Sequence, residues 1–153
     1  MLLRLPKTQA DLLRDALAKA GTREIGGQLF GEQLAPSDFR VSELVIQRRH
    51  GTVARFFVDL LAAARAGARF FEKTGHRYKS FNYIGEWHSH PSFAVQPSGT
   101  DIGVMQGLVS DSLFNGTFAA LMIVRLDGDQ LRTGAWVFDR QGGPESIELK
   151  EEQ

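Results

Sequence analysis

Hydrophobic positions recur along this chain with two different periods, and the period separates the expected helices from the expected strands. Apolar residues fall at helical spacing after Thr8 and again over Phe56–Lys73, so the pattern predicts a helix in each stretch. Asp11, three residues after Thr8, predicts a capping pair for the first helix, and Gly21 predicts its end. A third helix is predicted over Gly99–Val109.

Stretches rich in aromatic and β-branched residues lie between these helices and predict strands. Met1–Leu5 predicts a short edge strand. Further strands are predicted over Ile25–Leu34, Phe39–Gln47, Phe81–His88, Thr117–Leu126, Leu131–Asp139 and Ile147–Leu149. Helices interleaved with hairpins are typical of the α/β class, so we expect one domain over residues 1–153, with helices flanking a mixed, largely antiparallel sheet.

Composition narrows the chemistry that this domain can perform. A chain of 153 residues suits one domain, and 18 basic residues balance 18 acidic ones, which argues against nucleic acid or an anionic membrane as a partner. There is no cysteine, so any metal must be held by His, Asp or Glu. No stretch has a signal-peptide core or the roughly 20 apolar residues of a membrane helix, so we expect a cytoplasmic protein.

One segment gathers the side chains that bind metal ions, at the end of the strand predicted to reach His88. It reads Gly85-Glu86-Trp87-His88-Ser89-His90-Pro91, and Pro97-Ser98-Gly99-Thr100-Asp101 follows. Because side chains alternate along a strand, His88 and His90 can point to the same side, while Asp101 lies in the first turn of the next helix. Two imidazoles and a carboxylate can bind a divalent metal, and zinc with one open position for water fits a site without thiolates. Either part of the motif is common alone, but the two together at this spacing are rare.

The spacing His88-Ser89-His90, seven residues, Ser98, two residues, Asp101 resembles the signature of the JAMM metalloproteases, the catalytic branch of the JAB/MPN domains. Upstream, Glu24-Ile25-Gly26-Gly27-Gln28-Leu29-Phe30-Gly31 resembles the glutamate-bearing strand of that family. The order of the expected elements agrees over nearly the whole chain, and the short length looks most like the bacterial single-domain branch. The resemblance implies a single MPN/JAB-like domain with a cytidine deaminase-like layout.

The resemblance also implies a role for each residue of the motif. His88, His90 and Asp101 would bind Zn²⁺. Glu24 would take a proton from the water that the metal activates and deliver it to the leaving amine, and Ser98 would hydrogen-bond the oxyanion. The implied activity is that of a peptidase or isopeptidase acting on the C-terminal tail of a ubiquitin-like or sulfur-carrier protein, with an activating or conjugating enzyme as a neighbour.

Several alternatives stay open at this point. From spacing alone Glu86, two residues before His88, rivals Glu24 as the base, and it could instead orient a ligand histidine. Trp87 and Ser89 alternate away from the ligands, which predicts a core position for Trp87 and a local hydrogen bond for Ser89. The apolar loop Phe93–Val95 could form part of a substrate groove or cover the core. A non-catalytic MPN-like scaffold for protein interactions is the alternative function, whereas a zinc deaminase is excluded because it needs cysteine ligands.

Overall fold

The computed structural model describes residues 1–47 and 60–153. In chain order its elements are β1 (Leu2–Leu5), α1 (Lys7–Ala20), β2 (Gly26–Ala35), β3 (Asp38–Leu44), α3 (Leu60–Lys73), β4 (Phe81–Ser89), α4 (Gly99–Ser110), β5 (Phe118–Asp127), β6 (Gln130–Asp139) and β7 (Gly142–Glu151). The order of helices and strands agrees with the order predicted from the sequence. The start of the helix predicted at Phe56 lies outside the described residues.

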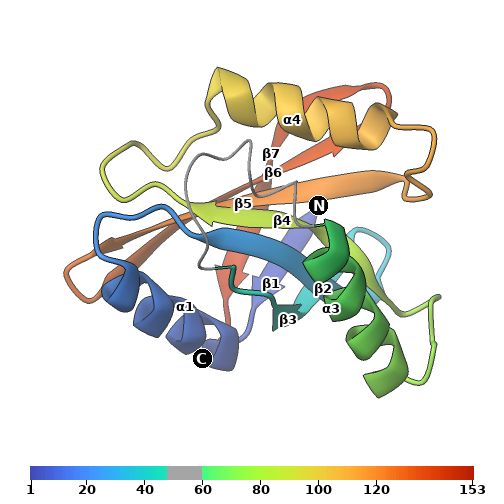
Figure 1. Ribbon diagram of the computed structural model, residues 1–153, viewed down its shortest axis with the longest axis horizontal. Coiled ribbons are helices and arrows are strands. Elements are labelled where there is room, and N and C mark those ends of the chain that lie inside the picture. Colours follow the sequence, from blue (N-terminus) through green and yellow to red (C-terminus); the bar gives the residue numbers. More distant parts are fainter. Residues whose placement is uncertain (48–59) are drawn as a thin grey trace.

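The strands form one sheet in the order β1-β3-β2-β4-β5-β6-β7, and β1 also pairs with β7, so that the sheet closes on itself (Figure 1). The pairings β1–β3, β1–β7 and β4–β5 are parallel and the other four are antiparallel, which confirms the mixed, largely antiparallel sheet. The prediction that Met1–Leu5 is an edge strand is wrong. Leu3 and Leu5 both point into the core, and β1 is paired on both of its backbone edges.

The first helix begins before Thr8 and has no side-chain cap. Pro6 is its N-cap residue, and the Pro6 carbonyl accepts hydrogen bonds from two backbone N–H groups of the first turn. The predicted capping pair is wrong because Thr8 already lies inside that turn, and Asp11 pairs instead with Lys7 at 2.6 Å. Gly21 ends the helix as predicted, with φ at 62°.

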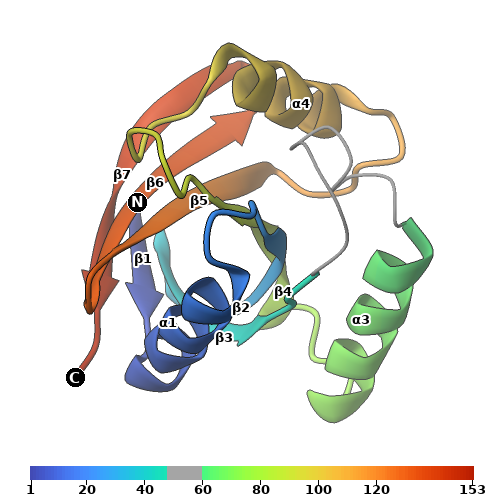
Figure 2. The same cartoon turned by 60° about the vertical axis from the view of Figure 1, so that its left-hand side comes forward.

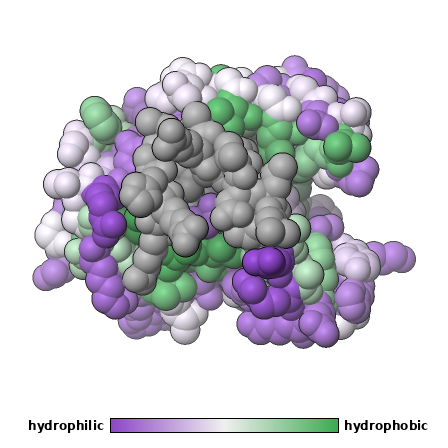
Figure 3. Space-filling model, viewed as in Figure 1, coloured by the Kyte–Doolittle hydropathy of each residue, from purple (hydrophilic) through white to green (hydrophobic). Residues whose placement is uncertain are grey.

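The three helices pack on opposite sides of the curved sheet. Figure 2 shows α1 on its concave side, with α3 and α4 on its outer side. Alternation along β5 explains this arrangement: Met122 and Val124 pack in the cluster that contains α1, whereas Leu121 and Ile123 pack in the cluster beneath α4. A third cluster joins α3 to β2 through Phe30. Hydrophilic residues gather over the outer side of α3 (Figure 3).

Two strands end or begin at other residues than predicted, because the neighbouring strands determine how far each one pairs. β3 ends at Leu44, and Gln47 forms only an isolated bridge with Gly26. β7 is much longer than the predicted Ile147–Leu149, because β6 pairs with its first part and β1 with its last part. None of the helices in the described ranges has the length and apolar character needed to cross a membrane.

Close approach between β4 and β5 requires a glycine at position 85. Gly85 has φ at 150°, and a Cβ there would lie 1.9 Å from the Ala120 carbonyl oxygen. The register between β2 and β4 shifts at this point. As a result, Tyr83 and Glu86, three residues apart, hydrogen-bond to each other. His88, near the end of β4, and His90, just beyond it, follow this irregular part of the strand.

Candidate metal centre

The two histidines lie at the carboxyl end of β4, on the outer side of the sheet. His88 pairs in register with Ile123 of β5, and the His90 N–H extends the ladder by donating to the Val124 carbonyl at 2.9 Å. Both histidines are buried: 3% of the His88 surface and 6% of the His90 surface is exposed to solvent. Trp87, between β2 and β5, faces the other side and is buried in the core as predicted.

Asp101 reaches the histidines because a capping box fixes the first turn of α4. The Ser98 hydroxyl accepts from the Asp101 N–H at 3.1 Å, and one Asp101 carboxylate oxygen accepts from the Ser98 N–H at 2.7 Å. The other carboxylate oxygen, Oδ1, is buried and has no hydrogen-bond partner among the described residues. A buried carboxylate oxygen without a donor is costly unless a cation or another donor faces it.

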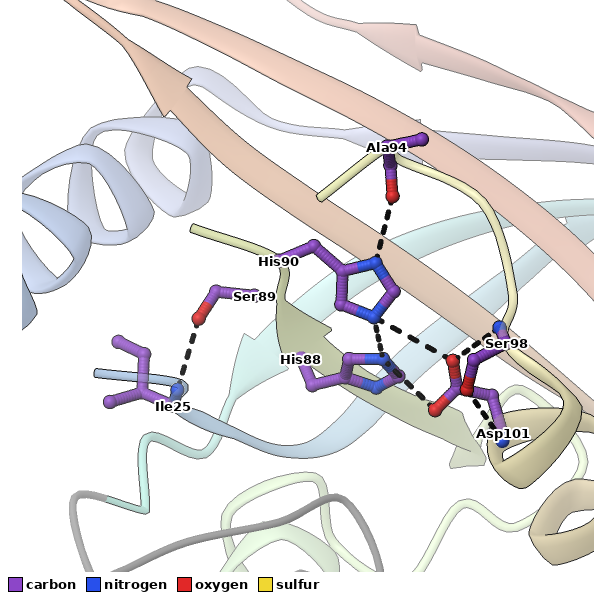
Figure 4. A network of polar contacts seen from close by, with 7 residues as sticks. All are labelled: Ile25, His88, Ser89, His90, Ala94, Ser98 and Asp101. Atoms are coloured by element: carbon purple, nitrogen blue, oxygen red, sulfur yellow. Dashed lines mark hydrogen bonds and ion pairs between the residues drawn. The ribbon is translucent and has the colours of Figure 1, made fainter. Parts of the chain in front are cut away.

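Three ligand atoms converge on one point (Figure 4). The Nε2 atoms of His88 and His90 lie 3.0 Å apart, and they lie 3.3 and 3.6 Å from the two carboxylate oxygens of Asp101. Ligand atoms around a tetrahedral zinc ion are about 3.3 Å from one another, given metal–nitrogen distances of about 2.0–2.1 Å. The donor types and their separations therefore fit a zinc ion with a fourth position left open.

The protonation of this group also suits a metal. Burial alone would raise the pKa of Asp101, but the two histidines and the Ser98 N–H outweigh it and hold that pKa well below its usual range. His90 Nδ1 lies 2.8 Å from the Ala94 carbonyl oxygen. This contact requires a proton on Nδ1, so in the neutral ring the Nε2 atom carries the lone pair that can bind a metal.

Glu24 and Ser98 line a pocket of about 480 Å³ together with His90. Glu24 is partly buried and close enough to raise the pKa of His90 further, beyond the larger effect of Asp101. The sheet places it there: Ser89, between the two histidines, accepts a hydrogen bond from the Ile25 N–H at 3.0 Å and donates its own N–H to the Ile25 carbonyl. Ser89 does form a hydrogen bond, but the prediction of a local one is wrong, because the partner is Ile25, the residue after Glu24 and 64 positions away along the chain.

Glu86 occupies a different environment from Glu24. It is buried in β4, where it accepts hydrogen bonds from the Tyr83 hydroxyl at 2.7 Å and from Gln28 Nε2 at 3.5 Å. Burial raises the pKa of Glu86 to about 8, although both hydrogen bonds oppose the rise. The hydrogen bonds of Glu86 described here go to Tyr83 and Gln28, and its side chain does not line the pocket shared by Glu24 and Ser98.

The loop after His90 combines the two roles left open for it. Phe93 is 63% exposed and lines the pocket with Ala94, and the Phe93 ring stands edge-on to the His90 imidazole. Val95 is partly buried against the cluster under α4. One part of the loop thus forms a wall beside the metal centre, and the next part covers the core.

Comparison with known proteins agrees with this geometry. A family model described as prokaryotic homologs of the JAB domain matches residues 6–138. The solution structure of protein DSY2949 from Desulfitobacterium hafniense aligns with a TM-score of 0.66 at 18% identity, covering 99% of this chain and 93% of that one. The crystal structure of AF2198, a JAB1/MPN domain protein from Archaeoglobus fulgidus, aligns with a TM-score of 0.53 at 16% identity, covering 98% and 99%. No curated protein matches the chain.

Proposed function

The chain belongs to the family of prokaryotic homologs of the JAB domain, and on this premise we propose that it is a zinc-dependent hydrolase of peptide or isopeptide bonds. The observation that carries the proposal is the convergence of two imidazole nitrogens with a buried, unpartnered carboxylate oxygen, beside a pocket that also holds Glu24 and Ser98. A buried donor set of this kind is costly to the fold unless a cation binds it.

Each residue of the site has a chemical role in this proposal. His88, His90 and Asp101 would hold Zn²⁺, which when bound acts as a Lewis acid and lowers the pKa of water. Glu24 accepts a proton from the attacking water and transfers it to the amine nitrogen as the carbon–nitrogen bond breaks. The products are a carboxylate and a free amine.

Ser98 stabilises the negative charge that develops on the carbonyl oxygen. Its Oγ already accepts the Asp101 N–H, and a hydroxyl that accepts one hydrogen bond can still donate its own proton. A donor held in place before the reaction is worth most in catalysis.

For the substrate, we propose the C-terminal tail of a ubiquitin-like or sulfur-carrier protein. The family resemblance supports this class of substrate. An extended tail would suit an open pocket whose wall carries the exposed Phe93, and the zero net charge of the chain suits a partner recognised by shape rather than by long-range attraction. An activating or conjugating enzyme encoded beside this chain would supply such a substrate.

The test substitutes the proposed base. Glu24→Gln keeps the size of the side chain but removes the proton acceptor, so we expect the variant to bind zinc as the wild type does and to lose hydrolysis by at least about 100-fold. Hydrolysis is followed by release of a reporter fused to the tail of a ubiquitin-like protein, and zinc content is measured on the same samples.

Glu32→Gln is the matched control, because Glu32 also belongs to the β2 region but does not line the pocket. It should leave both measurements unchanged. Full activity in Glu24→Gln would remove Glu24 from the mechanism. A wild-type protein with neither zinc nor hydrolysis would favour the alternative function, a scaffold for protein interactions.

A further inference from the structure

The loop of residues 91–97 has two consecutive carbonyl groups with different partners. The Phe93 carbonyl accepts a hydrogen bond from Arg125 Nη1 at 2.9 Å. The next carbonyl, that of Ala94, lies 2.8 Å from His90 Nδ1. The two carbonyls belong to consecutive planar peptide units that meet at the Ala94 Cα, so a displacement of the first unit shifts the second. Arg125 is thus connected to a ligand histidine through two hydrogen bonds and the backbone of Ala94.

Arg125 is itself held in place at the end of β5. Its Nε and Nη2 atoms pair with the two carboxylate oxygens of Asp127 at 2.7 and 2.8 Å, which leaves Nη1 for the loop. The preceding residue, Val124, accepts the His90 N–H. The anchor of the loop and the histidine therefore start from neighbouring points of the same strand pair.

Little else fixes this part of the loop. Among the described residues, Arg125 is the one side chain outside the loop, apart from His90, that hydrogen-bonds its backbone. The Phe93 side chain is 63% exposed, so burial contributes little there. Further on, Val95 packs into the core. Within the loop, the Ala94 carbonyl also accepts the Gln96 N–H at 2.8 Å. That turn moves with the loop, so the hydrogen bond from Arg125 to Phe93 is what ties the turn to β5 beside His90.

We propose that Arg125 is a positioning residue of the metal centre: through the Phe93–Ala94 peptide it holds the carbonyl that fixes the proton on His90 Nδ1 and aims His90 Nε2 at the metal. The proposal rests on the proposed function in one respect, that His90 is a zinc ligand. The planar guanidinium is essential to it, because three nitrogens must serve Asp127 and the loop at once.

The test measures zinc affinity, by competition with a chromophoric chelator, in wild type, Arg125→Ala, Arg125→Lys and Arg132→Ala. Partners that orient metal ligands are worth roughly 10–100-fold in affinity, so we expect both Arg125 variants to bind zinc about tenfold more weakly. Arg132 is the matched control: it also faces Asp127, at 3.5 Å, but does not touch the loop. Its variant should bind zinc as the wild type does.

Thermal unfolding of the zinc-free proteins separates positioning from folding. The Arg125–Asp127 pair is partly exposed, so the zinc-free variants should unfold near the wild-type temperature. If Arg125→Ala fails to fold, Arg125→Lys decides the question. Wild-type zinc affinity in the Arg125 variants, or an equal loss in Arg132→Ala, would overturn the proposal. Absence of zinc binding in the wild type would instead overturn the proposed function, and this inference with it.

Discussion

At the scale of single residues, Ser98 and Asp101 each serve the fold and the site at the same time. One oxygen of Asp101 completes the cap of α4 and lies near His90, and the other faces His88. The Ser98 hydroxyl accepts a hydrogen bond from the same helix turn and borders the pocket. The helix cap thereby sets the direction of the Asp101 carboxylate and of the Ser98 hydroxyl, which we propose as a metal ligand and an oxyanion donor.

Ser98→Ala should therefore reduce both stability and catalysis. Loss of a serine N-cap costs about 1 kcal/mol in the free energy of unfolding, and loss of an oxyanion donor costs about 100-fold in kcat. Chemical denaturation measures the first and hydrolysis of the fused tail the second. Ser98→Gly separates them, because glycine caps helices almost as well as serine does. Equal kcat in Ser98→Gly and wild type would contradict the proposed role of the hydroxyl.

The sequence was sufficient to predict that His88, His90 and Asp101 come together, because local spacing places them. It could not predict contacts that depend on strand register. The bond of Ser89 to Ile25 crosses from β4 to the start of β2. Sequence alternation placed Glu86 beside His88, but it could not show that Tyr83 would donate to it, since the shift at Gly85 changes which residues share a face.

At the scale of elements, the pairing of β2 with β4 brings the two strands very close together beside His88. Gly26 lies opposite His88, and a Cβ at Gly26 would come within 2.3 Å of the Trp87 carbonyl oxygen and 2.9 Å of His88 Cβ. The glycine-rich start of β2 is thus required by the histidine strand beside it. A sequence pattern can mark such a glycine, but only the register shows which neighbour needs it.

Gly26→Ala should push the two strands apart at His88. We expect a loss of about 1–3 kcal/mol in the free energy of unfolding, as for other overpacked sites, together with weaker zinc binding. Gly31→Ala is the control: its Cβ would also meet backbone and side-chain atoms, at 2.6–2.7 Å, but further along β2. It should destabilise the protein and leave zinc affinity as it is. Weaker zinc binding in Gly31→Ala, with wild-type zinc binding in Gly26→Ala, would contradict this explanation.

The ion pair between Arg4 and Asp38 joins β1 to β3 and predicts a dependence of stability on pH. The hydrogen bonds from Arg4, at 2.7 and 2.8 Å, lower the pKa of Asp38 below 3.8. A lowered carboxyl pKa adds stability above the unfolded-state pKa, and this stability is lost as the pH falls through the folded-state pKa. Asp38→Asn should therefore lower the thermal midpoint at neutral pH, and its difference from wild type should shrink toward about pH 2.

Asp11→Asn is the comparison for this prediction. Asp11 also has a lowered pKa, owing first to Lys7, but its partners belong to the same helix. Its substitution should change the thermal midpoint less, because no strand pairing depends on it. A difference between Asp38→Asn and wild type that is the same at every pH would show that charge is not involved.

At the scale of the whole molecule, three hydrophobic clusters pack against the sheet, and the candidate metal centre lies where β4 ends. The fold class could be predicted from the local spacing of hydrophobic residues, which is clearly helical in α1 and clearly that of a strand in β5. Closure of the sheet could not be predicted in the same way. It depends on β1 pairing with β7 at the other end of the sequence, and no local pattern specifies a partner so far away.

Removal of zinc should lower the free energy of unfolding without unfolding the protein, because the three hydrophobic clusters contain none of the proposed ligands. A ligand that binds only the folded state adds about 2.7 kcal/mol at a free concentration of 100 times Kd. We expect the thermal midpoint to rise with added zinc and to return when a chelator is present. Asp101→Asn, which keeps an oxygen acceptor for the Ser98 N–H, should stay folded and show no rise. An equal rise in that variant would place the zinc elsewhere.

The pairing of β1 with β7 also has a consequence for synthesis. Leu2 leaves the ribosome long before Glu148, its partner in the closed sheet. The chain can bring Glu24, His88, His90 and Asp101 together while one side of β1 still lacks its neighbour. Pairings between such distant residues slow folding. We therefore expect the nascent chain to acquire its ligand residues first and its completed, protease-resistant sheet only with the last strand.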